Sequence, residues 1–277
     1  MKLFRSADQT FYGKSLRTGG RFTLRGGIFA AFAMLWLALV AHSGYIRYHE
    51  SAGARAFENI TIPDELALAT SDPSRWLTQA DRGNVQIGKD HLHRAMRSGL
   101  FTNVDAMPKL AWLEYLAGNK ETAAELLDKA AALSTGRQRT LSLYYRGAIL
   151  SRSGRAEEAL VSLKSALETS SDLAAGYEEL GEALWRLGRV EEAEAAWQAA
   201  VKKGSGLPLA NNFLAGAAEV RSAMDTAATF ERRAEQFTPR DARFRWMLGT
   251  RLKNLGMDRI AEKQFSEARK LDTGLKQ

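Results

Sequence analysis

The chain of 277 residues contains no cysteine. This absence excludes disulfides, thiolate metal sites and cysteine nucleophiles, although it leaves the redox compartment open. Its 5 prolines and 23 glycines are too few for a collagen-like or low-complexity chain. No serine elbow, HExxH motif or paired-carboxylate motif is present. The sequence therefore predicts a protein that is not an enzyme, with no catalytic residues, no cofactor and no metal site.

Acidic residues are scarce near the N-terminus. Residues 1–25 carry a net charge of +5 out of +7 for the whole chain, and residues 26–46 carry no charge. The remaining sequence is nearly balanced, so a nucleic-acid partner is not expected. A basic stretch directly before an apolar run is instead typical of a segment that orients a membrane helix.

Residues 26–46, GGIFAAFAMLWLALVAHSGYI, form this apolar run. As a helix they span roughly 31 Å, which is close to the thickness of the bilayer's hydrocarbon core. A cleaved signal peptide has a shorter apolar core, and a buried helix usually has one polar face. We therefore predict a transmembrane helix that contacts lipid. Both alternatives, cleaved signal and buried helix, stay open at this point.

A period of 34 residues follows in the sequence. RGAILSRSGRAEEALVSLKSAL aligns with LGEALWRLGRVEEAEAAWQAAV, so that Gly147 matches Gly181 and Leu163 matches Trp197. The same positions recur at Gly249 and Phe265. Small residues at fixed positions predict pairs of helices that cross closely.

This pattern resembles the tetratricopeptide repeat, a helix–turn–helix unit of 34 residues. The resemblance implies an all-α fold: one transmembrane helix followed by a right-handed superhelix, or α-solenoid, of about five to six units. The expected organisation is a cytoplasmic basic tail (1–25), a transmembrane helix (26–46), a connector (47–70) and a repeat domain (71–273). Clear units are expected at 140–173, 174–207, 208–241 and 242–273, and degenerate units at 70–103 and 104–139. Arg146 and Glu231 depart from the pattern, since they replace an expected leucine and an expected aromatic residue.

Two weaker motifs are discounted. GNVQIGKD (83–90) is one letter from a phosphate-binding loop, but Asp90 stands where a hydroxyl should hold magnesium, and the preceding residues resemble a helix. His91 and His93 lie two apart, which points their rings about 200° apart on a helix. Neither motif supports a small-molecule substrate or a shared metal ion.

The resemblance implies a concave groove lined by the first helix of each unit. Aromatic residues mixed with both signs of charge at these positions suit a peptide or a protein segment. A Lys and Asn clamp for C-terminal carboxylates is absent, because Tyr144 and Ala148 occupy its positions. The candidate partner-binding residues are Trp112, Tyr115, Tyr144, Arg152, Glu178, Glu182, Trp185, Arg186, Asn212, Trp246 and Lys253.

Together these features predict a membrane-anchored scaffold that binds proteins and assists the assembly or stability of a cell-envelope complex. The expected location is the bacterial inner membrane, with the N-terminus in the cytoplasm and the repeats in the periplasm. The alternative is a constitutive subunit of a membrane complex that is held chiefly by its transmembrane helix. Gly27 and Ala31, four residues apart, would permit close helix contact for that role.

Overall fold

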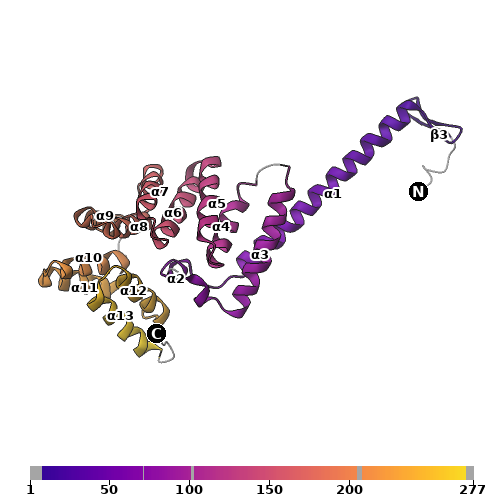
Figure 1. Ribbon diagram of the computed structural model, residues 1–277. Coiled ribbons are helices and arrows are strands. Elements are labelled where there is room, and N and C mark those ends of the chain that lie inside the picture. The colour runs from indigo at the N-terminus through magenta and orange to yellow at the C-terminus, as the bar shows by residue number, and fades with distance from the viewer. Residues whose placement is uncertain (1–7, 71, 101–102, 205–207, 273–277) are drawn as a thin grey trace.

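The computed structural model describes residues 8–70, 72–100, 103–204 and 208–272, and these residues form a curved array of paired helices with one long helix projecting from it (Figure 1). The predicted helical-repeat fold is confirmed. Its core is continuous from Ile62 to Ala268 and holds the inward faces of successive pairs.

Five helix pairs follow one another along the array. Each pair is an antiparallel hairpin whose helices contact each other and the next pair, so each buries the apolar face of its neighbour. The pairs are α4 (Ala106–Leu116) with α5 (Lys120–Leu133), α6 (Gly136–Arg152) with α7 (Ala156–Thr169), α8 (Ala174–Arg186) with α9 (Val190–Lys203), α10 (Pro208–Val220) with α11 (Met224–Phe237), and α12 (Ala242–Asn254) with α13 (Asp258–Leu271).

The 34-residue period reflects close approach at glycine. A Cβ added at Gly147 would lie 2.5 Å from Cγ of Leu163, and one added at Gly249 would lie 2.8 Å from Cδ1 of Phe265. Gly181 approaches the ring of Trp197 in the same way. Any larger residue would push the two helices of the unit apart, which explains why glycine recurs at this position.

A further helix pair precedes these five and differs from the expected unit. A helix–turn–helix unit was expected over 70–103, but this stretch holds a short 3₁₀ helix, η1 (Pro73–Trp76), and a single long helix, α3 (Gln79–Ser98). The partner of α3 is the end of α1 (Leu24–Glu58), against which it packs extensively. A Cβ at Gly53 would meet Cγ of Leu92 at 2.6 Å, so this pair uses the same glycine contact as the repeats.

The two departures from the repeat pattern are explained by ion pairs. Arg146 contacts Asp128, with 3.2 Å between Nε and Oδ1, and also donates to Ser162. Glu231 accepts from Lys263 at 2.9 Å and pairs with Arg259. Charged residues at these positions therefore join neighbouring helices at the surface in place of an apolar contact.

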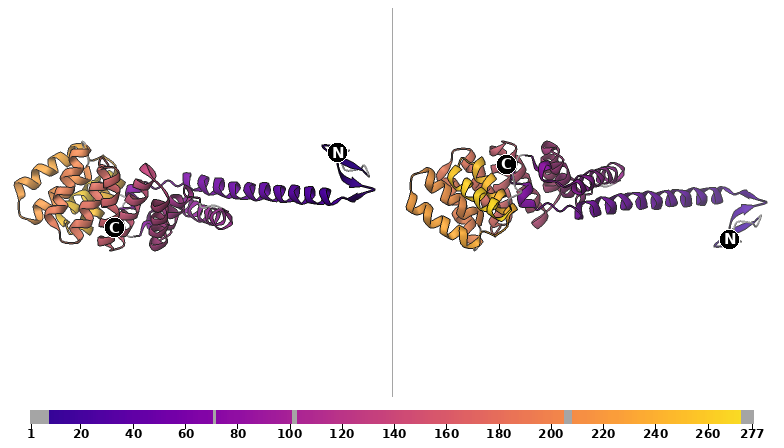
Figure 2. Two further views of the ribbon diagram at one scale, coloured as in Figure 1. Left: turned by 90° about the horizontal axis from the view of Figure 1, so that it is seen from above. Right: turned by 90° about the horizontal axis from the view of Figure 1, so that it is seen from below.

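Helix α1 continues well beyond the apolar run. It extends from the proposed span through residues assigned to the connector and ends at Glu58, before Pro63. Only Gly26, His49, Gly53 and Ala56 are buried in it, and its apolar N-terminal part extends away from the array (Figure 2). Trp36 is 64% exposed and Leu35 is 57% exposed. The buried-helix interpretation of residues 26–46 is therefore wrong.

Residues 9–22 form a small antiparallel sheet that the sequence did not predict. Its strands are β1 (Gln9–Phe11), β2 (Lys14–Thr18) and β3 (Arg21–Phe22), in the order β1-β2-β3. Tyr12 and Gly13 in the first turn, and Gly19 and Gly20 in the second, all have positive φ, which suits two-residue hairpin turns. The sheet is fixed to the start of α1 because Thr23 donates its N–H to the carbonyl of Leu16 at 3.0 Å.

Candidate functional site: the concave face

The concave face is formed by the first helices of the pairs, and the chain crosses it between α1 and α3. We call residues 62–70 of this crossing segment the strap. It contains the one-turn helix α2 (Asp64–Ala67), which lies between the early helices of the array and α12 (Figure 1). Leu66 and Leu68 of the strap are 6% and 3% exposed, and Ala67 and Ala69 are completely buried.

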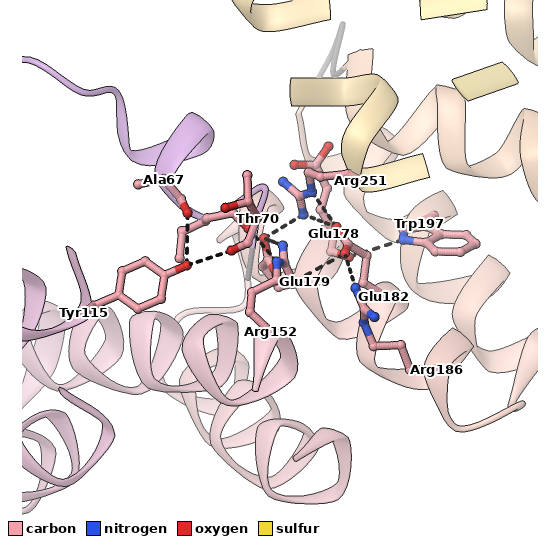
Figure 3. Close-up of polar contacts among 11 residues, drawn as sticks. Ala67, Thr70, Tyr115, Arg152, Glu178, Glu179, Glu182, Arg186, Trp197 and Arg251 are labelled. Carbon is pink, nitrogen blue, oxygen red and sulfur yellow. Dashed lines mark hydrogen bonds and ion pairs between the residues drawn. The ribbon is translucent and has the colours of Figure 1, made fainter. Parts of the chain in front are cut away.

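Three side chains of the concave face hold the strap. The hydroxyl of Tyr115 on α4 donates to the carbonyl of Ala67 at 3.0 Å and to that of Thr70 at 3.4 Å (Figure 3). Nε of Arg152 on α6 donates to the carbonyl of Leu68 at 2.5 Å. These contacts are made with backbone oxygens, so they require a polypeptide but no particular side chain.

The third contact is made by Tyr145 on α6. Its hydroxyl donates to Oδ2 of Asp64 at 2.6 Å. Burial raises the pKa of Asp64 above its ordinary value, and the hydrogen bond from Tyr145 opposes this rise. The concave face therefore binds one acidic side chain of the strap in addition to its backbone.

An ionic centre of four buried side chains lies behind the strap: Arg152, Glu179, Glu182 and Arg251. Nη2 of Arg152 lies 2.9 Å from Oε2 of Glu179, and its Nη1 lies 3.3 Å from Oε2 of Glu182. Arg251 donates to Glu179 and to Glu182 at 2.7 Å each. Figure 3 shows the four side chains converging from α6, α8 and α12. Because each charge faces opposite charges, the burial of all four is compensated.

The ionic centre joins helices that are far apart in the sequence. Arg251 belongs to the last pair, whereas Glu179 and Glu182 belong to a pair two units earlier. The array therefore curves enough for α12 to meet α8 across the concave side. Trp185 reinforces this contact, because its Nε1 donates to the carbonyl of Leu255 at 2.8 Å.

Glu178 lies beside the ionic centre and has an unusual pKa. Burial raises the pKa of this carboxyl to about 7, while Arg251 and a hydrogen bond from the N–H of Ala210 oppose the rise. That hydrogen bond is 3.0 Å long and connects α8 to α10. The carbonyl of Glu178 also accepts from Nε1 of Trp197 at 3.2 Å. Glu178 thus connects two successive units.

Most of the predicted groove residues are hidden from solvent. Trp112, Tyr115, Arg152, Glu178, Glu182, Asn212 and Trp246 are buried, Tyr144, Trp185 and Arg186 are half-buried, and Lys253 is exposed. The structure brings Arg152 and Glu182 together in the ionic centre and places Tyr115 against the strap. The strap covers Tyr115 and Arg152, and Arg251 of α12 covers Glu182. Trp246 instead packs on Phe265 of its own helix pair, and Asn212 contacts Gln264 of α13. Partner binding by these eleven residues stays a prediction.

An open cavity of about 610 Å³ adjoins two of the half-buried members of this set, Trp185 and Arg186. It is lined by Trp185 and Arg186 at the end of α8, by residues 154–158 between α6 and α7, and by Asn254 and Leu255 at the end of α12. The lining carries both signs of charge beside an aromatic ring. These properties suit a polar protein segment better than a small apolar ligand.

Three residues of the concave face were not among the predicted ones. Arg251, Glu179 and Tyr145 make its principal contacts, yet they stand outside the positions that the repeat family uses for its groove. The sequence did contain one indication of the strap, since LALA (66–69) is a short apolar run inside a segment assigned to a connector. Its spacing matches no repeat, so it gave no reason to place it against α4 and α6.

The discounted motifs have structural roles. Gly83 and Gly88 both lie inside α3, and a Cβ at Gly88 would meet Cδ1 of Leu113 at 2.8 Å, so this glycine permits α3 to approach α4. His91 and His93 face different partners: Nδ1 of His91 lies 2.8 Å from Nδ1 of His49, and Nε2 of His93 lies 2.7 Å from Glu114.

The architecture defines a tetratricopeptide-repeat fold with an N-terminal apolar helix. Solved structures of MamA and PilF, both tetratricopeptide-repeat proteins, have similar arrangements. A MamA crystal structure is 17% identical over 70% of this chain and 92% of its own, with a TM-score of 0.55. Pseudomonas aeruginosa PilF is 18% identical over 85% of this chain and 95% of its own, also with a TM-score of 0.55.

A structure of MamA from Desulfovibrio magneticus RS-1, from residue 41 to the end, is 19% identical over 64% of this chain and 97% of its own, with a TM-score of 0.52. At these identities the likeness concerns the fold. No model of a protein family matches the chain, and no curated protein sequence matches it.

Proposed function

We propose that this protein is a membrane-anchored scaffold that binds other proteins through the concave side of its repeat array and assists the assembly or stability of a cell-envelope complex. The observation that carries the proposal is the exposed apolar part of α1. Its exposed side chains include Phe32, Leu35, Trp36 and Leu39. The same helix continues to the part that packs on α3. Such a surface is costly in water and favourable in a lipid bilayer.

The flanking charges support an orientation. Lys14, Arg17, Arg21 and Arg25 precede the apolar part of α1, and the residues after it are mildly acidic. The positive-inside rule places the sheet of residues 9–22 in the cytoplasm and the array on the other side, in the periplasm of a bacterial inner membrane. Membrane lipid and envelope proteins are therefore the proposed partners, and nucleic acid is not.

The location is tested by fractionation and protease access. The full chain with a C-terminal tag should stay in the membrane pellet after alkaline carbonate treatment. Protease added to spheroplasts should remove the tag while an N-terminal tag survives. A C-terminal tag that is protected until the cells are lysed would contradict the orientation, and a chain extracted by carbonate would contradict the anchor.

Partner binding is tested with photoreactive residues in place of Tyr144, Trp185 or Trp246, with a position on the outer surface, Val161, as the matched control. Val161 is 67% exposed and lies on α7, a second helix of a pair. Crosslinks to the same protein from Trp185 or Trp246, and none from Val161, are expected. Equal crosslinking from all positions would remove the support for a concave binding site.

The alternative function, a subunit held by its membrane helix, is favoured by one observation. Gly27 lies on α1 with nothing near the place where its Cβ would be, so a second helix could approach closely there. Replacement of residues 26–46 by an unrelated membrane span separates the two functions. A complex that survives the exchange supports the concave face, and one that falls apart supports the membrane helix.

A further inference from the structure

The strap lies on the concave face in the manner of a bound peptide. It contributes no helix to any repeat pair, yet its residues Leu66 to Ala69 are among the most buried of the chain. Its hydrogen bonds to the array come from Tyr115, Tyr145 and Arg152, which belong to first helices of successive pairs. The strap therefore touches the surface where a partner is proposed to bind.

The ends of the strap are fixed independently of its middle. Asp81 at the start of α3 accepts from the N–H of Thr61 at 2.8 Å and from the hydroxyl of Thr78 at 2.7 Å. It also completes a capping box for α3 with Thr78. One carboxylate thus holds the residues on both sides of the loop that contains the strap. Residues 62–70 could leave the concave face without disturbing the pairing of α1 with α3.

The pocket that holds the strap has a definite chemistry. Ala67 and Ala69 have no exposed surface, so only small side chains fit at these two positions. Leu66 and Leu68 are nearly buried, so apolar side chains are favoured next to them. Asp64 supplies a carboxylate to Tyr145 two residues before Leu66. The recognised sequence is an acidic residue followed by alternating large and small apolar residues.

Space for a second chain exists beside the strap. A cavity of about 410 Å³ is lined by Pro63, Glu65 and Leu66 of this segment and by Phe244 and Met247 of α12, among others. An incoming segment could enter along this apolar cavity before it takes the place of the strap. The cavity and the strap site form one continuous surface from α12 to α4.

We propose that the strap is an intramolecular ligand that occupies the partner-binding site of the concave face. The partner presents a polypeptide segment of the same chemistry, with an acidic residue before small and large apolar residues in alternation, and displaces the strap. This inference rests on the proposed function, because it identifies the kind of partner and the surface that receives it. Competition from the strap lowers the apparent affinity of the partner until the strap is released.

The test uses the full chain in detergent and a synthetic peptide of residues 60–70, ITIPDELALAT. In one variant, residues 62–70 are replaced by glycine and serine in a linker of equal length. This variant is expected to bind the peptide at least about tenfold more tightly than the unaltered chain, because the internal competitor is gone. A peptide with lysine in place of Ala67 and Ala69 is the matched control and should not bind.

Equal binding to both chains, or equal binding of the lysine peptide, would overturn the proposal. If the linker variant loses its cooperative melting, the strap is a permanent part of the core and the proposal also fails. Hydrogen exchange of the unaltered chain gives an independent measurement. The amides of Leu66 and Leu68 should exchange about 100-fold faster than those of the middle of α8 through local opening, and equal rates would contradict a strap that is released.

These experiments distinguish failure of the strap inference from failure of the scaffold function. If the peptide does not bind but photocrosslinks from Trp185 still identify a partner, the strap inference fails and the concave face keeps its proposed role. If both are absent, both proposals fail.

Discussion

Two regions of this molecule reverse the usual distribution of residues. The outer part of α1 exposes its apolar side chains, with Phe32 68% and Met34 65% exposed. The centre of the repeat array buries charged side chains, and Glu182 is completely inaccessible while Arg251 is 3% exposed. In a water-soluble protein either arrangement alone would be unfavourable.

The two regions differ in what offsets this unfavourable arrangement: other residues of the chain for the buried charges, and an external environment for the exposed apolar side chains. Charges in the array are compensated within the chain, because Arg152 and Arg251 each face both Glu179 and Glu182. The apolar side chains of α1 have no such partner in the described residues, and the bilayer that we propose around them would supply the compensation. Under this proposal, α1 passes from lipid to the array before Gly53, where it packs on α3.

The largest effect is expected when a charge is removed from the array. Arg251→Met leaves Glu179 with Arg152, and Glu182 with Arg152 and the more distant Arg186, and should lower the free energy of unfolding by about 3–5 kcal/mol. Arg155→Met removes an exposed ion pair with Glu158 and serves as the control, with no measurable change. The denaturation midpoint of the full chain in detergent checks both variants. A midpoint of Arg251→Met equal to that of the control would contradict a compensated ionic centre.

The converse change adds a charge to the apolar helix. Leu35→Arg should disfavour membrane insertion by about 3 kcal/mol, whereas Leu35→Phe should be neutral. The measurement is the fraction of each variant that remains in membranes after carbonate treatment. Equal fractions would indicate that residue 35 does not lie in lipid.

A pH dependence is expected from Glu178. Its folded pKa of about 7 lies above the ordinary value of 4.5, so the folded state binds the proton more tightly than the unfolded state. Stability should therefore decrease as pH rises from about 4.5 to 7 and level off above that range. Glu178→Gln keeps an acceptor for the N–H of Ala210 and should remove about 2–3 kcal/mol of this decrease. Melting temperatures at pH 5 and pH 8 test it; an unchanged difference between them would refute the assignment.

A smaller effect is expected where the two regions meet. Gly53→Val places methyl groups against Leu92, and overpacking of this kind should cost about 1–3 kcal/mol. Gly44→Val on the same helix is the matched control, since nothing lies within 4 Å of a Cβ there. Thermal melting should separate the two variants. If they melt alike, α1 and α3 do not form a packed pair.

Sequence periodicity was sufficient for the contiguous pairs. Gly147, Gly181 and Gly249 recur because each meets a large side chain of its own second helix, and that contact repeats with the unit. The pair of α1 and α3 was not predicted, because the strap separates these two helices in the sequence. Gly53 and Leu92 therefore do not have the spacing of a repeat. The sheet of residues 9–22 was not predicted because its strands are only 3, 5 and 2 residues long, too short for a clear alternation of apolar and polar side chains.

The concave site was predictable only in part. Positions such as Tyr115 and Arg152 follow from the register of the repeat, and they do lie on the inner wall. The contact of Arg251 with Glu182 depends on rotation accumulated over several units, which no short pattern contains. The strap is held mainly through backbone carbonyls, and such contacts leave little trace in the side chains of the sequence.

The most direct test of the central claim is the environment of α1 along its length. Spin labels at Leu35, Leu39, Val40 and Ala54 of the full chain in lipid vesicles should report accessibility to oxygen and to a water-soluble nickel complex. We predict that labels at Leu35, Leu39 and Val40 are accessible to oxygen and protected from nickel, and that nickel access rises at Ala54. Nickel access to the labels at Leu35, Leu39 and Val40 equal to that at Ala54 would contradict a helix that passes from the bilayer into the repeat array.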